Sequence, residues 1–243
     1  KPILLNKNDT VVFYYNKKPK LKIKAYFVLL SNPLSKIFKL KNFLVNDNQY
    51  KFKTVNLSKN YLIGKSMQKF LLETKKGLNI PGAIYSEKIQ KKNILNFIKK
   101  IDDKKVRYDA IGISYVQTSN ILKTIKKKIT NKSLVSKIEN YSGVKNAEDI
   151  IKNSSAVMID RGDLSAEIGE QKLFEKTEKI KEICNFFSKP ILMATQNLYS
   201  MRSQDLPTQS EIFSLGYAKK NFFDMLMLSD ETAISKNWKK ILL

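Results

Sequence analysis

The stretch AVMIDRGDLSAEIG, Ala156–Gly169, joins a short apolar run to an abruptly charged end. A short apolar run that is bounded by turn residues is typical of a buried strand. Two carboxylates and an arginine follow it directly, packed around Gly162. Two interpretations are open: the chain reaches solvent and turns, or Asp163 lies at the edge of a site and holds a positive group.

The segments on either side repeat this pattern. Strand-like apolar runs recur near residues 110, 134, 157, 191 and 225, with helix-like segments between them. This alternation predicts βα units and a parallel sheet, hence the α/β class. Five strands cannot close an eight-stranded barrel, so we expect a partial TIM (β/α)8 barrel. No GxGxxG or GxxxxGK[ST] pattern lies between the runs, which disfavours Rossmann and P-loop sites.

The first part of the chain has a different character. The segments VVFYY, LKIKAYFVLL and YKFKTVNL are rich in β-branched and aromatic residues, which favours strands. We therefore expect a small β-rich domain over residues 1–75 and the partial barrel over residues 76–243. The only cysteine, Cys184, falls on an apolar stripe of a predicted helix and is expected in the core.

Composition narrows the possible chemistry. With one cysteine and no histidine, the chain cannot form an internal disulfide framework or a thiolate zinc cluster, and it lacks the usual general base. The net charge of +23 comes mainly from scattered lysines, since only three residues are arginine. We interpret this charge as a compositional bias on solvated surfaces rather than a nucleic-acid footprint.

The sequence also suggests a cellular setting. Its longest apolar run, Ala25–Leu30, is too short to span a bilayer, and no signal-peptide pattern is present. We therefore expect a cytoplasmic protein with no membrane segment. Because the first residue is Lys1 rather than Met, we interpret the chain as processed, trimmed or a fragment.

Polar residues follow each predicted strand, at the end where barrel enzymes keep their sites. Glu139 and Asp163 can share a Mg²⁺ or Mn²⁺ ion through oxygen. Lys137 can neutralise charge on a transferring phosphoryl group, and Thr195 can hydrogen-bond a substrate carboxylate. Each also has a plain alternative as a solvated turn or a helix cap. The last strand is followed by Ser229, Asp230 and Glu231.

Several motifs resemble pyruvate kinase, in the same order along the chain. They are SKIENYSGV, DRGDLSAEI, KPILMATQNLYSM, LPTQSE and MLSDETA, preceded by KKGLNIPG with SEK shortly after it. The resemblance is specific from Lys75 to about Ala233. It implies a lid domain followed by barrel strands four to eight, with the first three strands and the C-terminal domain outside this chain.

The resemblance also implies an activity, the transfer of a phosphoryl group from phosphoenolpyruvate to ADP that yields pyruvate and ATP in the last step of glycolysis. Lys137 matches the family's phosphoryl-transfer lysine, and Glu139 and Asp163 match its Mg²⁺ (or Mn²⁺) ligands. Gly162 matches the residue whose backbone binds the substrate carboxylate. Thr195 matches the family's substrate-binding threonine, which lies near the proton-transfer step. The family further implies K⁺, whose ligands lie outside this chain, and a homo-oligomer in the complete protein.

Four positions depart from the family pattern. The family usually has a small residue where Asp160 stands, glycine at the positions of Ser165 and Asp230, and arginine at a subunit contact where Gln209 stands. Two alternatives follow: a non-catalytic pyruvate kinase-like protein, or a related metal-dependent barrel enzyme that acts on a pyruvate-type enolate. We expect the 243 residues alone to be inactive, because five strands leave the barrel open.

Overall fold

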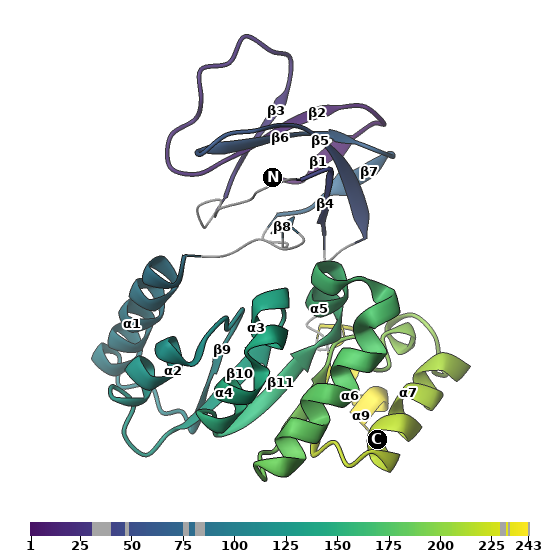
Figure 1. The fold of residues 1–243 in the computed structure, drawn as a ribbon. Coiled ribbons are helices and arrows are strands. Elements are labelled where there is room, and N and C mark those ends of the chain that lie inside the picture. The colour runs from purple at the N-terminus through teal and green to yellow at the C-terminus, as the bar shows by residue number, and fades with distance from the viewer. Residues whose placement is uncertain are drawn as a thin grey trace. The chain divides into compact units, whose positions relative to one another are not determined.

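The computed structural model describes residues 1–30, 40–46, 49–74, 78–80, 86–228, 232 and 234–242. It divides into two compact units (Figure 1). One consists of Lys1–Gln90 together with Ala166–Ile168, and the other of Lys91–Ser165 together with Gly169–Leu243. The division of the chain at residue 75 into a lid and a partial barrel stays a prediction.

The first unit is built from strands. A six-stranded sheet has the order β3-β2-β6-β5-β4-β8, in which only the β2–β3 pair is parallel, and β1 pairs antiparallel with β7. The strands are β1 (Ile3–Leu5), β2 (Thr10–Tyr14), β3 (Tyr26–Leu29), β4 (Asn42–Val45), β5 (Tyr50–Leu57), β6 (Tyr61–Ser66), β7 (Phe70–Leu72) and β8 (Leu78–Asn79).

An aromatic cluster forms the core of this unit. Phe43 and Phe52 are fully buried and stack with ring centroids 5.0 Å apart, and Phe13 meets each of them edge-on at 5.5 Å. Gly64 on β6 faces this cluster, where a Cβ atom would lie 2.4 Å from Cζ of Phe43. Only glycine leaves room for the rings at that position, because real Cβ contacts are never so short.

The second unit contains a parallel sheet, as the sequence predicts. Its five strands have the order β13-β12-β11-β10-β9, and every neighbouring pair is parallel. They are β9 (Ala110–Ile113), β10 (Ser133–Ile138), β11 (Ala156–Asp160), β12 (Ile191–Ala194) and β13 (Met225–Met227). Each lies at an expected position, and the partial-barrel fold is confirmed. Among the described strands, β9 and β13 are edges, so the sheet is open.

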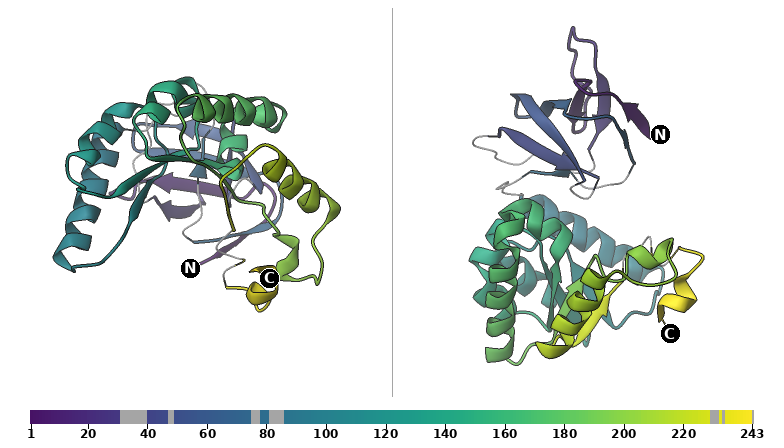
Figure 2. Two further views of the ribbon diagram at one scale, coloured as in Figure 1. Left: turned by 90° about the horizontal axis from the view of Figure 1, so that it is seen from below. Right: turned by 90° about the vertical axis from the view of Figure 1, so that its right-hand side faces the viewer.

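Helices connect these strands and lie along one side of the sheet (Figure 2). Apolar residues of the connecting helices, including Ile98, Ile121 and Ile125, pack against Ile111 and Leu134 of the sheet. The helices are α1 (Glu87–Asp103), α2 (Ser119–Lys126), α3 (Tyr141–Lys145), α4 (Ala147–Lys152), α5 (Arg161–Ile168), α6 (Glu170–Phe186), α7 (Gln209–Lys220) and α9 (Trp238–Leu242), with a 3-10 turn at Ser200–Arg202.

Two further expectations concern the interior and the membrane. Cys184 on α6 is fully buried, which confirms that it belongs to the core. None of the helices in the described residues is both long and apolar enough to cross a membrane.

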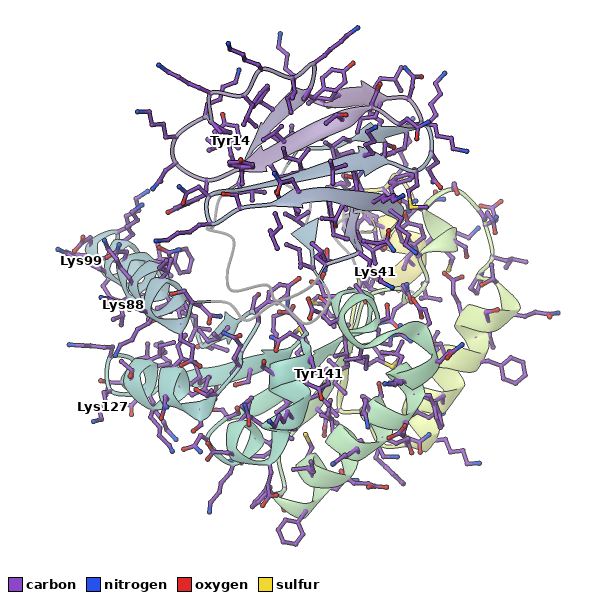
Figure 3. The ribbon with its side chains drawn as sticks, turned by 45° about the horizontal axis from the view of Figure 1, so that its top comes forward. Tyr14, Lys41, Lys88, Lys99, Lys127 and Tyr141 are labelled. Carbon is purple, nitrogen blue, oxygen red and sulfur yellow. The ribbon has the colours of Figure 1, made fainter. Side chains whose placement is uncertain are left out.

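Lysines are exposed on several elements. Lys88 and Lys99 on α1, Lys127 at the end of α2 and Lys41 before β4, all labelled in Figure 3, are exposed to solvent. This scatter is consistent with the interpretation of the charge as a compositional bias, which stays a prediction.

Candidate active site at the carboxyl ends of the strands

Three carboxylates meet where β10 and β11 end. Strand β10 places Lys137 opposite Met158 and Ile138 opposite Ile159 of β11, so the two strands end level. Glu139 follows β10 directly, and Asp160 is the last residue of β11. Oxygen atoms of Glu139, Asp160 and Asp163 all lie within 4.8 Å of one another.

The Lys137 ammonium group lies among these carboxylates. It forms an ion pair with Glu139, lies 3.6 Å from Oδ2 of Asp160, and donates to Oγ of Ser114 at 3.4 Å. Burial is the largest single influence and lowers the pKa of Lys137, but the combined attraction of Glu139, Asp160 and Asp163 outweighs it, so the pKa lies above its ordinary value. Lys137 therefore stays charged near neutral pH.

Glu139 is the most deeply buried member of the cluster, with no exposed surface. Burial raises its pKa to about 7, although the neighbouring Lys137 opposes this shift. Its Oε1 pairs with Lys137, and its Oε2 accepts a hydrogen bond from the backbone N–H of Tyr115 at 2.6 Å. Ionisation of Glu139 therefore responds to any nearby cation, whether a lysine or a metal ion.

The loop after β9 completes this side of the site, and the sequence analysis missed it. Tyr115 has a left-handed backbone, with φ of 54°, and Ser114 approaches Lys137. The N–H of Val116 donates to the carbonyl of Lys137 at 3.3 Å, which holds the loop against β10. The sequence signal was weak, because Ser114 and Tyr115 lie inside the strand-like segment AIGISYV and follow the strand only in the structure, where β9 ends at Ile113.

The start of helix α5 connects the acidic cluster to Thr195. Asp160 is the N-cap, and its Oδ1 accepts from the N–H of Asp163 at 3.4 Å. The N–H of Gly162 donates to Oγ1 of Thr195 at 3.1 Å, and this hydroxyl donates to the Ala194 carbonyl at 2.8 Å. The structure thus brings both backbone and side-chain candidates to adjacent strand ends.

Thr195 begins an unusual turn. Thr195 and Gln196 are consecutive non-glycine residues in the left-handed region, with φ of 64° and 55°. Such conformations cost of order 1–3 kcal/mol each and cluster at functional sites, where the surrounding structure enforces them. The turn therefore needs specific support from its neighbours.

The carboxylate cluster fits a hard divalent cation. Mg²⁺ and Mn²⁺ prefer oxygen ligands, and an octahedral ion with bonds of about 2.1 Å spaces opposite ligands about 4.2 Å apart. Adjacent ligands of the same ion lie about 3.0 Å apart. The ligand atoms of the three carboxylates, now within 4.8 Å of one another, would therefore draw closer around a bound ion. Asp160 adds a third carboxylate to the Glu139–Asp163 pair that the sequence indicates.

The remaining departures from the expected motifs have different surroundings. Ser165 is accommodated within α5, where its hydroxyl donates to the Gly162 carbonyl at 3.0 Å. Gln209 is the exposed first residue of α7. Asp230, with Ser229 and Glu231, lies outside the described residues.

The fold and the site together define a class, a parallel α/β barrel segment with a cluster of carboxylates at the carboxyl ends of its strands. A family model described as "Pyruvate kinase, barrel domain" matches residues 1–239. The chain belongs to the pyruvate kinase family.

Individual relatives agree with this assignment. The chain is 32% identical to "Pyruvate kinase" of Eimeria tenella over 199 residues, which are 78% of this chain and 36% of that protein. It is 36% identical over 172 residues to "Probable pyruvate kinase, cytosolic isozyme" of Arabidopsis thaliana, covering 67% of this chain and 33% of that protein. The chain thus spans about a third of the length of these relatives.

A solved structure shares the fold. The crystal structure of a pyruvate kinase from Cryptosporidium parvum aligns with a TM-score of 0.75 and 24% identity, covering 99% of this chain and 51% of that one. This likeness shows that the chain shares its fold with that protein.

Proposed function

We propose that this chain forms part of a pyruvate kinase that transfers a phosphoryl group from phosphoenolpyruvate to ADP. The observation that carries the proposal is the Lys137 ammonium held between Glu139 and Asp160, with Asp163 beside them, at the strand ends. The family assignment makes phosphoryl transfer the reaction that best uses this combination of one cation and several metal-type carboxylates.

Lys137 supplies a fixed positive charge. In phosphoryl transfer, negative charge spreads over the phosphoryl oxygens, and a positioned cation in a water-poor site stabilises it. The Lys137 side chain is only 20% exposed, and its ion pairs hold it before substrate arrives. Removing such a stabiliser typically lowers the rate ~10²–10³-fold.

Glu139, Asp163 and, in this chain, Asp160 would hold Mg²⁺ or Mn²⁺. When bound, the metal would supply positive charge to substrate oxygens and favour the enolate form of the product. Because the pKa of Glu139 is about 7 in the metal-free protein, the site should bind metal more weakly as pH falls below that value.

Gly162 and Thr195 would bind the carboxylate end of the substrate. A backbone N–H at the start of α5 suits a carboxylate, because helix N-termini favour anions. The Thr195 hydroxyl now engages Gly162 and Ala194, and it retains an acceptor lone pair for the substrate or for a proton in transit.

The test is an assay of pyruvate formation from phosphoenolpyruvate, ADP, Mg²⁺ and K⁺, with the full-length product of the reading frame. Lys137→Met should abolish turnover while the protein stays folded, because methionine retains the length and loses the charge. Glu139→Gln and Asp163→Asn should raise the Mg²⁺ concentration needed, because each removes one charge from the ion's site.

The alternatives make different predictions in the same assay. An inactive wild type that still binds Mn²⁺ would favour the non-catalytic interpretation. Activity on a pyruvate-type acid without any need for ADP would favour the related enolate enzyme. Near-normal activity of Lys137→Met would refute the role proposed for this lysine.

The proposal extends to the setting of the complete protein. We infer a cytoplasmic enzyme that requires K⁺ and works as a homo-oligomer, as in the family. The 243 residues alone should show no turnover, because the five-stranded sheet leaves the barrel open.

A further inference from the structure

Arg161 is the first residue of α5, yet its side chain reaches across to the end of β12. The guanidinium donates to the carbonyl of Ala194 at 3.3 Å, to the carbonyl of Thr195, and to Oδ1 of Asn197 at 2.9 Å. A fourth bond, at 2.7 Å, goes to Oγ of Ser214 on α7. A planar guanidinium is suited to bind several acceptors at once, and lysine cannot reproduce this geometry.

Apart from Ser214, these acceptors belong to the left-handed turn that begins at Thr195 or directly precede it. The carbonyls of Ala194 and Thr195 flank the residue with φ of 64° and precede Gln196, with φ of 55°. The amide of Asn197, itself buried, donates to the carbonyls of Met193 and Met227, so it ties the same turn to the ends of β12 and β13. Arg161 therefore supports a strained conformation at several points.

Arg161 also precedes Gly162 directly. The Gly162 N–H donates to Oγ1 of Thr195, while the neighbouring Arg161 side chain holds the Thr195 carbonyl. Two consecutive residues of α5 thus donate hydrogen bonds to Thr195, Gly162 to its hydroxyl and Arg161 to its backbone carbonyl. No other arginine among the described residues makes several such bonds; Arg202, for example, donates once, to the carbonyl of Tyr199 at 3.3 Å, and stacks on the ring of the same residue at 3.7 Å.

We propose that Arg161 is a positioning residue that fixes the Thr195 turn and, through it, the alignment of the Thr195 hydroxyl with the Gly162 amide. Its hydrogen-bond acceptors are Ala194, Thr195, Asn197 and Ser214, none of which belongs to the acidic cluster. The effect of Arg161 on catalysis rests on the proposed function, because it would act through a residue of the proposed active site.

The test uses the substitution Arg161→Lys in the full-length protein. Lysine keeps the positive charge but lacks the planar guanidinium that donates to several acceptors at once. We expect kcat to fall ~10- to 100-fold, since small misplacements of a catalytic group have effects of this size. The affinity for Mn²⁺, measured by electron paramagnetic resonance without substrate, should change less than about twofold, because the charge near Asp160 is retained. Arg202→Lys, the matched control, should leave both quantities unchanged.

A double-mutant cycle separates positioning from general stability. If Arg161 acts through Thr195, adding Arg161→Lys to Thr195→Val should lower kcat by less than about threefold. Losses that multiply in the double variant would overturn the proposal, and so would an unchanged kcat in Arg161→Lys.

A second measurement decides the question even if the protein has no pyruvate kinase activity. Hydrogen exchange of the Gly162 amide, followed by NMR, should accelerate at least ~10-fold in Arg161→Lys, because its acceptor on Thr195 is no longer fixed. The Arg202→Lys control should leave this exchange unchanged. Unaltered Gly162 exchange in Arg161→Lys would overturn the inference, whereas an inactive wild type would count only against the proposed function.

Discussion

Replacing Lys137 with methionine should give the metal-free protein a pH-dependent loss of stability. The lysine pairs with the fully buried Glu139 and lies 3.6 Å from Asp160, so its removal leaves three carboxylates without their central cation. A unit charge about 4 Å away contributes about 4 kcal/mol at an effective dielectric constant of about 20, equivalent to about three pKa units. The pKa of Glu139 should therefore rise well above its present value of about 7.

The direction of the effect follows from linkage. The pKa of Glu139 is about 7 in the folded protein, above the ~4.3 of an unfolded glutamate, so wild-type stability falls as pH rises between these values and then levels off. In Lys137→Met the fall should continue beyond pH 7. The variant should therefore lose a further ~1.4 kcal/mol relative to wild type for each pH unit above 7, until its own Glu139 ionises.

The assay is urea unfolding in the presence of a chelator at pH 6, 7, 8 and 9. Lys123→Met is the matched control, because the Lys123–Asp149 pair spans 3.9 Å and both side chains are more than half exposed. Surface pairs of this kind contribute ~0–1 kcal/mol, so the control should differ little from wild type at every pH. A stability difference for Lys137→Met that is constant from pH 6 to 9 would refute the reasoning.

Two further predictions concern the interiors of the two units. Gly64→Ala should lower the free energy of unfolding by ~1–3 kcal/mol, because the added Cβ would lie 2.4 Å from Phe43 in a packed aromatic core. Thermal unfolding measures this effect, and an unchanged melting temperature would contradict the prediction. Cys184, fully buried and with its pKa raised to about 12, should react with a disulfide reagent only in denaturant; rapid labelling of the native protein at pH 8 would show that α6 opens more readily than its packing indicates.

Asp160 illustrates how a departure from the family motif acquires a physical meaning. In the sequence it is an added negative charge near a metal site. In the structure it also caps α5 through the N–H of Asp163 and contacts Lys137. Its carboxylate therefore has structural partners before any metal binds, and it increases the negative charge available to a cation.

The sequence by itself determined the secondary-structure plan of the second unit. Apolar runs near five positions became five parallel strands, because buried parallel strands need continuous apolar residues whatever their neighbours are. It also indicated Lys137, Glu139, Asp163 and Thr195, since polar residues at or just beyond the carboxyl ends of such strands meet at one edge of the sheet. Gly162 followed from the family resemblance and lies beside them.

Only the tertiary structure decided how these residues are held. The role of Arg161 depends on acceptors 33 to 53 positions away in the sequence. Tyr115 and Thr195 have left-handed backbones although neither is glycine, so the sequence gives no sign of these conformations. Asp160 joins the acidic cluster because the register of β10 and β11 aligns their ends. Local sequence specifies which elements form, but hydrogen bonds between side chains and distant backbone exist only after those elements have packed.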